Sequence, residues 1–178
     1  MNRKRFSPLS LLTAATVLFA IPPSGDAAYT SATPPNKGPT VPGSRAIVRG
    51  GIAYAPENAP LPVKRAIWAT NHLTRKPYVW GGGHGSFYDK GYDCSGTVSF
   101  LLHHADAIDR PAASRELAQF GNPGPGRWIT VYARNGHTFA TVAGLRLDTT
   151  GRRGDEGPRW REEPRSPAGF TARHPEGL

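Results

Sequence analysis

The chain has 178 residues, 38% of them apolar, which is enough for one compact domain with a modest core but not for two. Its 22 basic and 13 acidic side chains give a net charge of +9, which favours anionic surroundings. Nucleic acid is not an expected partner, because the sequence contains no recognisable nucleic-acid-binding module.

The first residues predict a secretory signal peptide over 1–27. Three positive charges at residues 3–5 precede an apolar stretch over 9–21, which Pro22 and Pro23 end before small residues at 25–27. The stretch is shorter than the roughly 20 residues that span a bilayer, so we expect no stable membrane anchor. The protein is then secreted, periplasmic or cell-wall associated. The mature chain keeps 19 basic and 12 acidic side chains, so we expect either anionic wall polymers and acidic peptides as partners, or a basic solvated surface without a specific partner.

Residues 28–60 are rich in Pro, Gly, Ser and Thr and show no sustained period. This composition predicts a flexible tether that leads into one folded domain over 61–178. The chain shows no internal repeat and no second module.

Two helices are expected at the start of that domain. Apolar residues recur at helical spacing over 62–75, and Lys76-Pro77 ends the run. A glycine-rich loop over 81–85 follows, and a second helix opens near Cys94, with Pro111 preventing its extension.

The second half of the domain favours strands. After a short helix over 114–120, strands are predicted at 128–133, 137–143 and 145–150, and Asn135-Gly136 is a strong hairpin signal between the first two. Helices followed by a meander indicate an α+β domain rather than an alternating α/β one. Residues 170–173 are a candidate for a further strand.

Cys94 is the only cysteine, so an exported chain that commonly uses disulfides cannot form one internally. The simplest interpretation is that Cys94 is a small buried apolar residue without a chemical role. The alternative is a nucleophile, because a helix N-terminus favours the thiolate through its unpaired N–H groups and dipole. His137 opens a strand directly after a tight turn, where rigid backbone holds an accessible imidazole, and is the expected base.

A third group is needed to orient the imidazole, and Asp148 is the expected one. If residues 143–144 form a two-residue hairpin loop, Val142 faces Leu145 and His137 lies diagonal to Asp148 on the same side of the sheet. The carboxylate would then accept from Nδ1–H and direct Nε2 toward Cys94. A shift of one residue would turn Asp148 to the other face, in which case it only begins a turn, and Thr150 is the next candidate.

Three motifs in this order resemble the NlpC-type cell-wall peptidases, a papain-like family. They are the segment 77–82 with the sequence Pro-Tyr-Val-Trp-Gly-Gly, the segment 92–96 with Tyr-Asp-Cys-Ser-Gly, and the segment 135–137 with Asn-Gly-His. The resemblance covers about residues 61–150. It implies a papain-like α+β fold, with helices followed by an antiparallel meander and the nucleophile at a helix N-terminus.

The resemblance also implies a function: hydrolysis of peptidoglycan stem peptides at the bond between γ-D-glutamate and the diamino acid, without a metal or other cofactor. It places Tyr78 beside the nucleophile, where it helps the Cys94 N–H to stabilise the oxyanion. Tyr92, Asp93 and Ser95 would line the pocket for the N-terminal side of the stem. Asp93 has a competing role as a helix N-cap.

Several alternatives remain open at this point. The same fold and thiol chemistry would also suit an amidase or an acyltransferase that acts on the cell wall. A further alternative is a wall-binding domain that has lost catalytic activity. The third catalytic position is often His, Asn or Gln in the family, and the arginine-rich stretch 152–165 has no counterpart in it. Among the other histidines, His84 is the one that could approach the site. His103 and His104 are adjacent on a helix and cannot share a metal, and His72 and His174 carry no signal.

Overall fold

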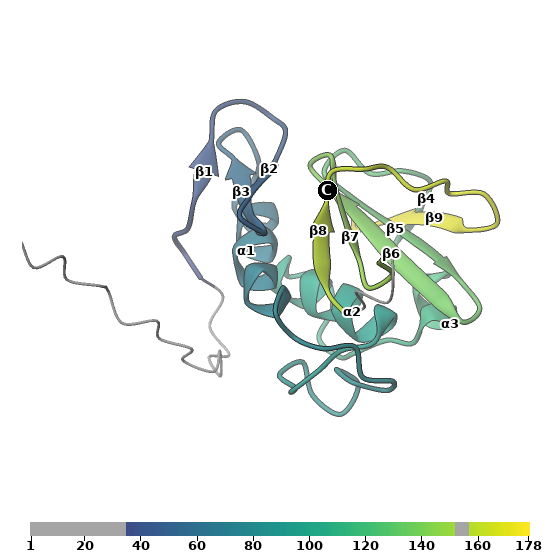
Figure 1. Cartoon of the computed structure of the whole chain (residues 1–178). Coiled ribbons are helices and arrows are strands. Elements are labelled where there is room, and N and C mark those ends of the chain that lie inside the picture. Colours follow the sequence, from purple (N-terminus) through teal and green to yellow (C-terminus); the bar gives the residue numbers. More distant parts are fainter. Residues whose placement is uncertain (1–34, 152–156) are drawn as a thin grey trace, which may run out of the picture.

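The computed structural model describes residues 35–151 and 157–178, which form a mixed α+β domain (Figure 1). The helices α1 (Leu61–Thr70), α2 (Cys94–His104) and α3 (Ser114–Leu117) precede most of the sheet. A single 3₁₀ turn, η1 (Asn71–Leu73), extends α1. None of the helices in these two ranges is long and apolar enough to cross a membrane. The signal peptide predicted over 1–27 lies outside the described residues.

The main sheet has six antiparallel strands in the order β4-β9-β5-β6-β7-β8. Their bounds are β4 (Asn122–Pro123), β5 (Ile129–Arg134), β6 (His137–Val142), β7 (Leu145–Asp148), β8 (Arg159–Arg161) and β9 (Thr171–His174). The predicted meander corresponds to β5, β6 and β7, and the candidate strand at 170–173 to β9. The strands β4 and β8 were not predicted, since each has only two or three residues.

Two tight turns set the register of the meander. Arg134 faces His137 across the turn at Asn135-Gly136, where Gly136 has φ +82°. Val142 faces Leu145 as predicted, and Ala143 and Gly144 both adopt positive φ, as a two-residue hairpin loop of this type requires. The register places the start of β6 beside the end of β7.

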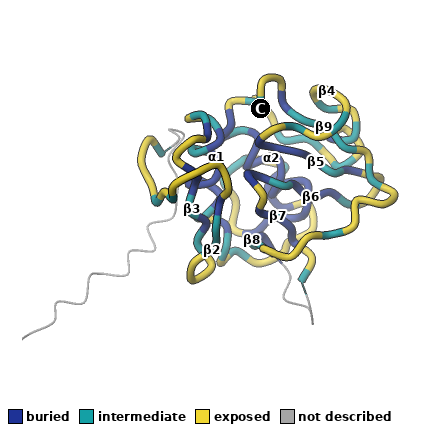
Figure 2. Tube along the Cα trace, turned by 90° about the horizontal axis from the view of Figure 1, so that it is seen from above, coloured by how far each residue is buried: buried dark blue, intermediate teal, exposed yellow. Residues whose placement is uncertain are grey.

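Helix α2 is buried on nearly every side because it packs between α1 and strands β6 and β7. Figure 2 shows the buried stretches gathered where α2 meets this sheet. Its apolar residues, such as Val98 and Leu101, join the largest core cluster together with Ile67 of α1 and Leu147 of β7. The N-terminus of α2 is therefore fixed on a packed core.

Residues 40–56 form a second sheet, with strands β1 (Thr40–Val41), β2 (Ile47–Arg49) and β3 (Ile52–Pro56) in the order β1-β3-β2. Ala53 and Ala55 are fully buried in the core, and the side chain of Asn71 exchanges two hydrogen bonds with the Ala53 backbone, at 2.8 and 2.9 Å. The prediction of a flexible tether up to residue 60 is therefore wrong for residues 40–56. Short strands with small alanine side chains lack the alternation of large apolar residues on which that prediction depended.

Candidate functional site

The start of α2 is braced by the segment that precedes it in sequence. The backbone of Tyr78 and Val79 runs parallel to Tyr92, and Asp93 N–H donates to the Gly82 carbonyl at 3.2 Å. Gly82 and Gly96 touch so closely that a Cβ at Gly96 would overlap the Gly82 carbonyl oxygen. The glycines of the two motifs are therefore required by close backbone approach, which brings residues 78–82 next to Cys94.

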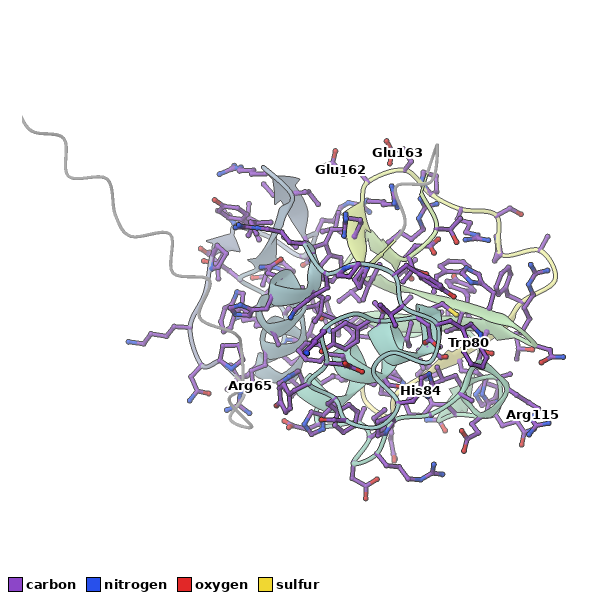
Figure 3. The ribbon with its side chains drawn as sticks, turned by 60° about the horizontal axis from the view of Figure 1, so that its bottom comes forward. Arg65, Trp80, His84, Arg115, Glu162 and Glu163 are labelled. Carbon is purple, nitrogen blue, oxygen red and sulfur yellow. The ribbon has the colours of Figure 1, made fainter. Side chains whose placement is uncertain are left out.

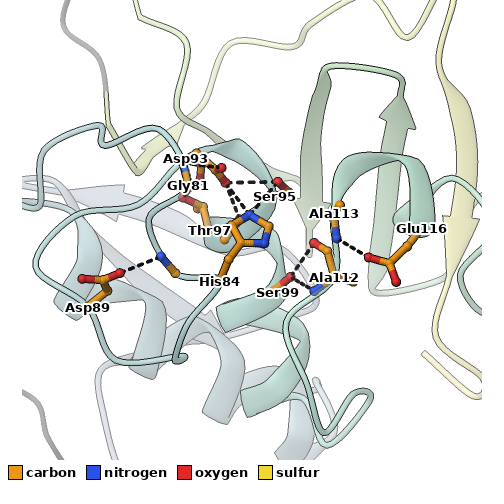
Figure 4. A network of polar contacts seen from close by, with 12 residues as sticks. Gly81, His84, Asp89, Asp93, Ser95, Thr97, Ser99, Ala112, Ala113 and Glu116 are labelled. Carbon is orange, nitrogen blue, oxygen red and sulfur yellow. Dashed lines mark hydrogen bonds and ion pairs between the residues drawn. The ribbon is translucent and has the colours of Figure 1, made fainter.

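Asp93 caps α2 and is saturated with hydrogen bonds (Figure 4). Its Oδ1 accepts from Gly96 N–H at 2.7 Å and from the Ser95 hydroxyl at 3.1 Å, and its Oδ2 accepts from Gly81 N–H at 3.1 Å. His84 Nε2 lies 3.1 Å from both Asp93 Oδ1 and Ser95 Oγ. The N-cap role of Asp93 is thus confirmed, and His84 does approach the site, on a side chain that is 29% exposed.

The two tyrosines of the predicted site have different surroundings. Tyr92 is 2% exposed, its ring packs edge-on against Phe100, and its hydroxyl donates to Phe87 O and accepts from Asp89 N–H. A buried ring with an occupied hydroxyl cannot line an open pocket, so the prediction for Tyr92 is corrected. Tyr78 is 37% exposed, and its backbone pairs with that of Tyr92, two residues before Cys94.

Cys94 and His137 meet between α2 and β6. Hydrogen bonds to Asp148 and then to Cys94 raise the pKa of His137 to about 9, against the opposing effect of burial. Both partners favour the imidazolium, which is the protonation state that a thiolate–imidazolium pair needs. The Cys94 N–H belongs to the first turn of α2, where amides have no carbonyl partner within the helix, so it is suited to an oxyanion.

Asp148 lies where the predicted register puts it. Its carboxylate is 1% exposed, and Oδ1 lies 3.5 Å from His137 Nε2. The predicted ring orientation is wrong, however, because Nε2 rather than Nδ1 faces the carboxylate, which leaves Nδ1 for Cys94. Thr150 Oγ1 is 3.4 Å from the same nitrogen, and Thr150 N–H donates to Asp148 Oδ1, so the turn role of Asp148 is present as well.

Arg165 is the contact that sequence reasoning missed. Its Nη1 donates to Asp148 Oδ2 at 2.8 Å and lies 3.0 Å from His137 Nε2, while its guanidinium packs over the rings of Phe139 and Phe170. Burial raises the pKa of Asp148, but hydrogen bonds from His137, Thr150 and Arg165 together hold that pKa below its usual value. The only signal in the sequence was the unassigned arginine-rich stretch in which Arg165 lies.

Arg165 and His137 compete for the same carboxylate. If Nε2 carries a proton and donates it to Asp148, it cannot also accept from the guanidinium, and two N–H donors then face each other at 3.0 Å. The positive charge of Arg165 therefore opposes the imidazolium that Asp148 favours. The strength of the base depends on the balance between them.

The remaining histidines lie away from this cluster. His104 is fully buried beside Phe100 and Tyr88, and His103 stacks on Phe87 with ring centroids 3.9 Å apart. No group of three His, Cys, Asp or Glu residues in 35–151 and 157–178 is arranged to hold a metal ion. No family model matches the chain, and neither does any curated protein or solved structure.

Proposed function

We propose that this protein is a papain-like cysteine peptidase of the NlpC type that hydrolyses stem-peptide amide bonds in peptidoglycan after secretion. The observation that carries the proposal is the grouping of Cys94, His137 and Asp148: Asp148 Oδ1 lies 3.5 Å from His137 Nε2, and Asp148 and Cys94 together raise the pKa of His137 to about 9. The motifs at 77–82, 92–96 and 135–137 support the choice of substrate, specifically the bond between γ-D-glutamate and the diamino acid.

In the proposed reaction the Cys94 thiolate attacks the carbonyl carbon of the scissile amide. The oxyanion is stabilised by the Cys94 N–H and the Tyr78 hydroxyl. His137 gives its proton to the leaving nitrogen, so the C–N bond breaks and a thioester remains on Cys94. Neutral His137 then takes a proton from water, whose oxygen attacks the thioester, and the products are a carboxylic acid and the regenerated thiolate–imidazolium pair.

The test is incubation of the purified mature protein with defined muropeptides, with products identified by mass spectrometry. Cleavage within the stem supports the proposal. Release of the intact stem from the sugar would indicate an amidase, transfer to an added amine an acyltransferase, and binding without turnover an inactive wall-binding domain. Cys94→Ala should show no product, and His72→Ala, which changes an exposed histidine of η1, should behave as the wild type.

The coupling of thiolate and base provides a second test. Cys94→Ser, His137→Ala and the double variant should lose activity to a similar extent, because two residues that act as one unit give non-additive losses. A double variant far less active than either single variant would show that the two side chains act independently.

A further inference from the structure

A basic pocket lies next to Cys94, His137 and Asp148, on the side of Asp148. It has a volume of about 380 Å³, and Arg146, Arg161 and Arg165 line it together with Asp148 and Glu163. Asp148 is the residue that faces His137, so the pocket begins one side chain away from the base. Arg146 comes from β7, Arg161 from β8 and Arg165 from the segment between β8 and β9, so three separate positions in the chain converge on it.

Among the described residues that line the pocket, the arginines outnumber the acidic side chains, which are Asp148 and Glu163. Asp148 Oδ2 already accepts a hydrogen bond from Arg165 at 2.8 Å. Its other oxygen, Oδ1, accepts from Thr150 N–H and faces His137. Arg146 reaches the same carboxylate only at 3.7 Å through Nε, a buried atom that makes no hydrogen bond within the described part of the chain. Burial is the main cause that lowers the pKa of Arg146, and the charges of Arg161 and Arg165 add to it, whereas Asp148 and Glu163 raise that pKa. Arg146 is therefore a partly desolvated cation whose Nε lacks a hydrogen bond, and an anion in the pocket would offset the cost of its burial.

A guanidinium group binds a carboxylate through two parallel N–H donors, whereas a lysine ammonium group acts as a point charge. A pocket lined by several arginines is therefore suited to a carboxylate ligand. Figure 3 shows Glu163, which lines the pocket, well separated from Trp80 and His84 near the other end of the site. The N-terminal side of the stem is expected at the end of the site where the partly exposed His84 contacts Asp93 and Ser95. A peptide that crosses the catalytic pair from that end would bring its C-terminal half toward the arginines.

We propose that this pocket binds a carboxylate in the part of the stem peptide beyond the cleaved bond, with Arg146 as its principal ligand. The inference rests on the proposed peptidase function and specifies which substrates that function prefers. Stems with a free carboxylate at the diamino acid are bound at both ends of the site. Stems in which that group is an amide lose the second anchor, because a neutral amide makes weaker hydrogen bonds with guanidinium.

The test compares a matched pair of synthetic stem peptides that differ only in a free acid or an amide at the diamino-acid carboxyl. The wild type should show a kcat/KM at least about tenfold higher for the acid, as the loss of one charge-assisted hydrogen bond predicts. In Arg146→Gln the acid-to-amide ratio should fall toward one, and Arg146→Lys should give an intermediate ratio. Arg115→Gln removes the same charge from the exposed face of α3 and should keep the wild-type ratio, which controls for general electrostatic attraction.

A binding measurement separates failure of this inference from failure of the proposed function. Calorimetry on Cys94→Ala should show tighter binding of the acid than of the amide, and Arg161→Gln on that background should reduce the difference. Cleavage of both peptides at equal rates in the wild type would overturn the carboxylate pocket and leave the peptidase intact. Failure to bind or cleave either peptide would overturn both.

Discussion

Replacing Asp148 by Asn should lower the pH at which the proposed peptidase loses activity on the alkaline side. The pKa of His137 is raised from 6.5 to about 9, which corresponds to about 3 kcal/mol in favour of the imidazolium. Asp148 is the largest cause of this rise and Cys94 the second. The leaving nitrogen needs a protonated His137, so activity persists below the raised pKa and is lost as pH rises through it. Removing the charge of Asp148 should move that alkaline limb down by on the order of one pH unit or more.

The assay is the pH dependence of kcat/KM on a soluble stem peptide, together with the rate of Cys94 alkylation by a small haloacetamide. In Asp148→Asn the alkylation profile should shift toward higher pH, since a weaker imidazolium supports less thiolate at neutral pH. Asp109→Asn changes an exposed carboxylate before α3 and is the matched control. Circular dichroism at each pH separates a catalytic effect from unfolding, because the buried Asp148 also forms ion pairs with the half-buried Arg146 and Arg165. If the pH dependence of kcat/KM and that of the alkylation rate were both unchanged in Asp148→Asn while the fold stayed intact, Asp148 would not be the orienting carboxylate.

Arg165→Gln should move the alkaline limb in the opposite direction, to higher pH, because it removes a positive charge 3.0 Å from His137 Nε2; a shift to lower pH would contradict the competition for Asp148. His104 is fully buried and its pKa is lowered to about 4, chiefly by burial, so folding stability should fall as pH drops from 6.5 toward 4, by up to about 3 kcal/mol. Urea unfolding at pH 7 and pH 4.5 should show a smaller pH effect in His104→Leu than in the wild type, and equal effects would rule this source out. Gly96→Ala should destabilise the fold by about 1–3 kcal/mol through overlap with the adjoining loop backbone, whereas Gly85→Ala, where a Cβ meets nothing within 4 Å, should leave the melting temperature unchanged.

The parts of the fold that could be predicted are those with strong local signals. Asp93 is an N-cap residue immediately before an apolar helix, and Asn135-Gly136 is a two-residue hairpin turn, so α2, β5 and β6 follow from short-range physical chemistry. The hairpin register in turn located Asp148 near His137. Each of these predictions depends on residues close together in sequence.

The parts that could not be predicted depend on contacts between distant residues. Nothing near Ala53 in the sequence indicates that Asn71 will bind its backbone, and nothing near Tyr92 shows that its ring faces Phe100 rather than a pocket. The contact between Arg165 and Asp148 joins residues 17 apart, and the sequence between them carries no hydrophobic period from which their pairing could be worked out. The choice of ring nitrogen on His137 likewise depends on three-dimensional placement that no spacing rule supplies.

The position of Arg165 in the chain has a consequence for how the reactivity of the site develops during synthesis and folding. Cys94 and His137 are both made before residue 165, and Arg165 reaches Asp148 only when the segment around Phe170 has packed against Phe139. Until then the carboxylate lacks the guanidinium that opposes the imidazolium, and the base has a different strength from that in the finished molecule. The acid–base properties of the site therefore depend on complete folding, so a partly folded chain and the folded protein should differ in thiol reactivity even though both contain Cys94 and His137.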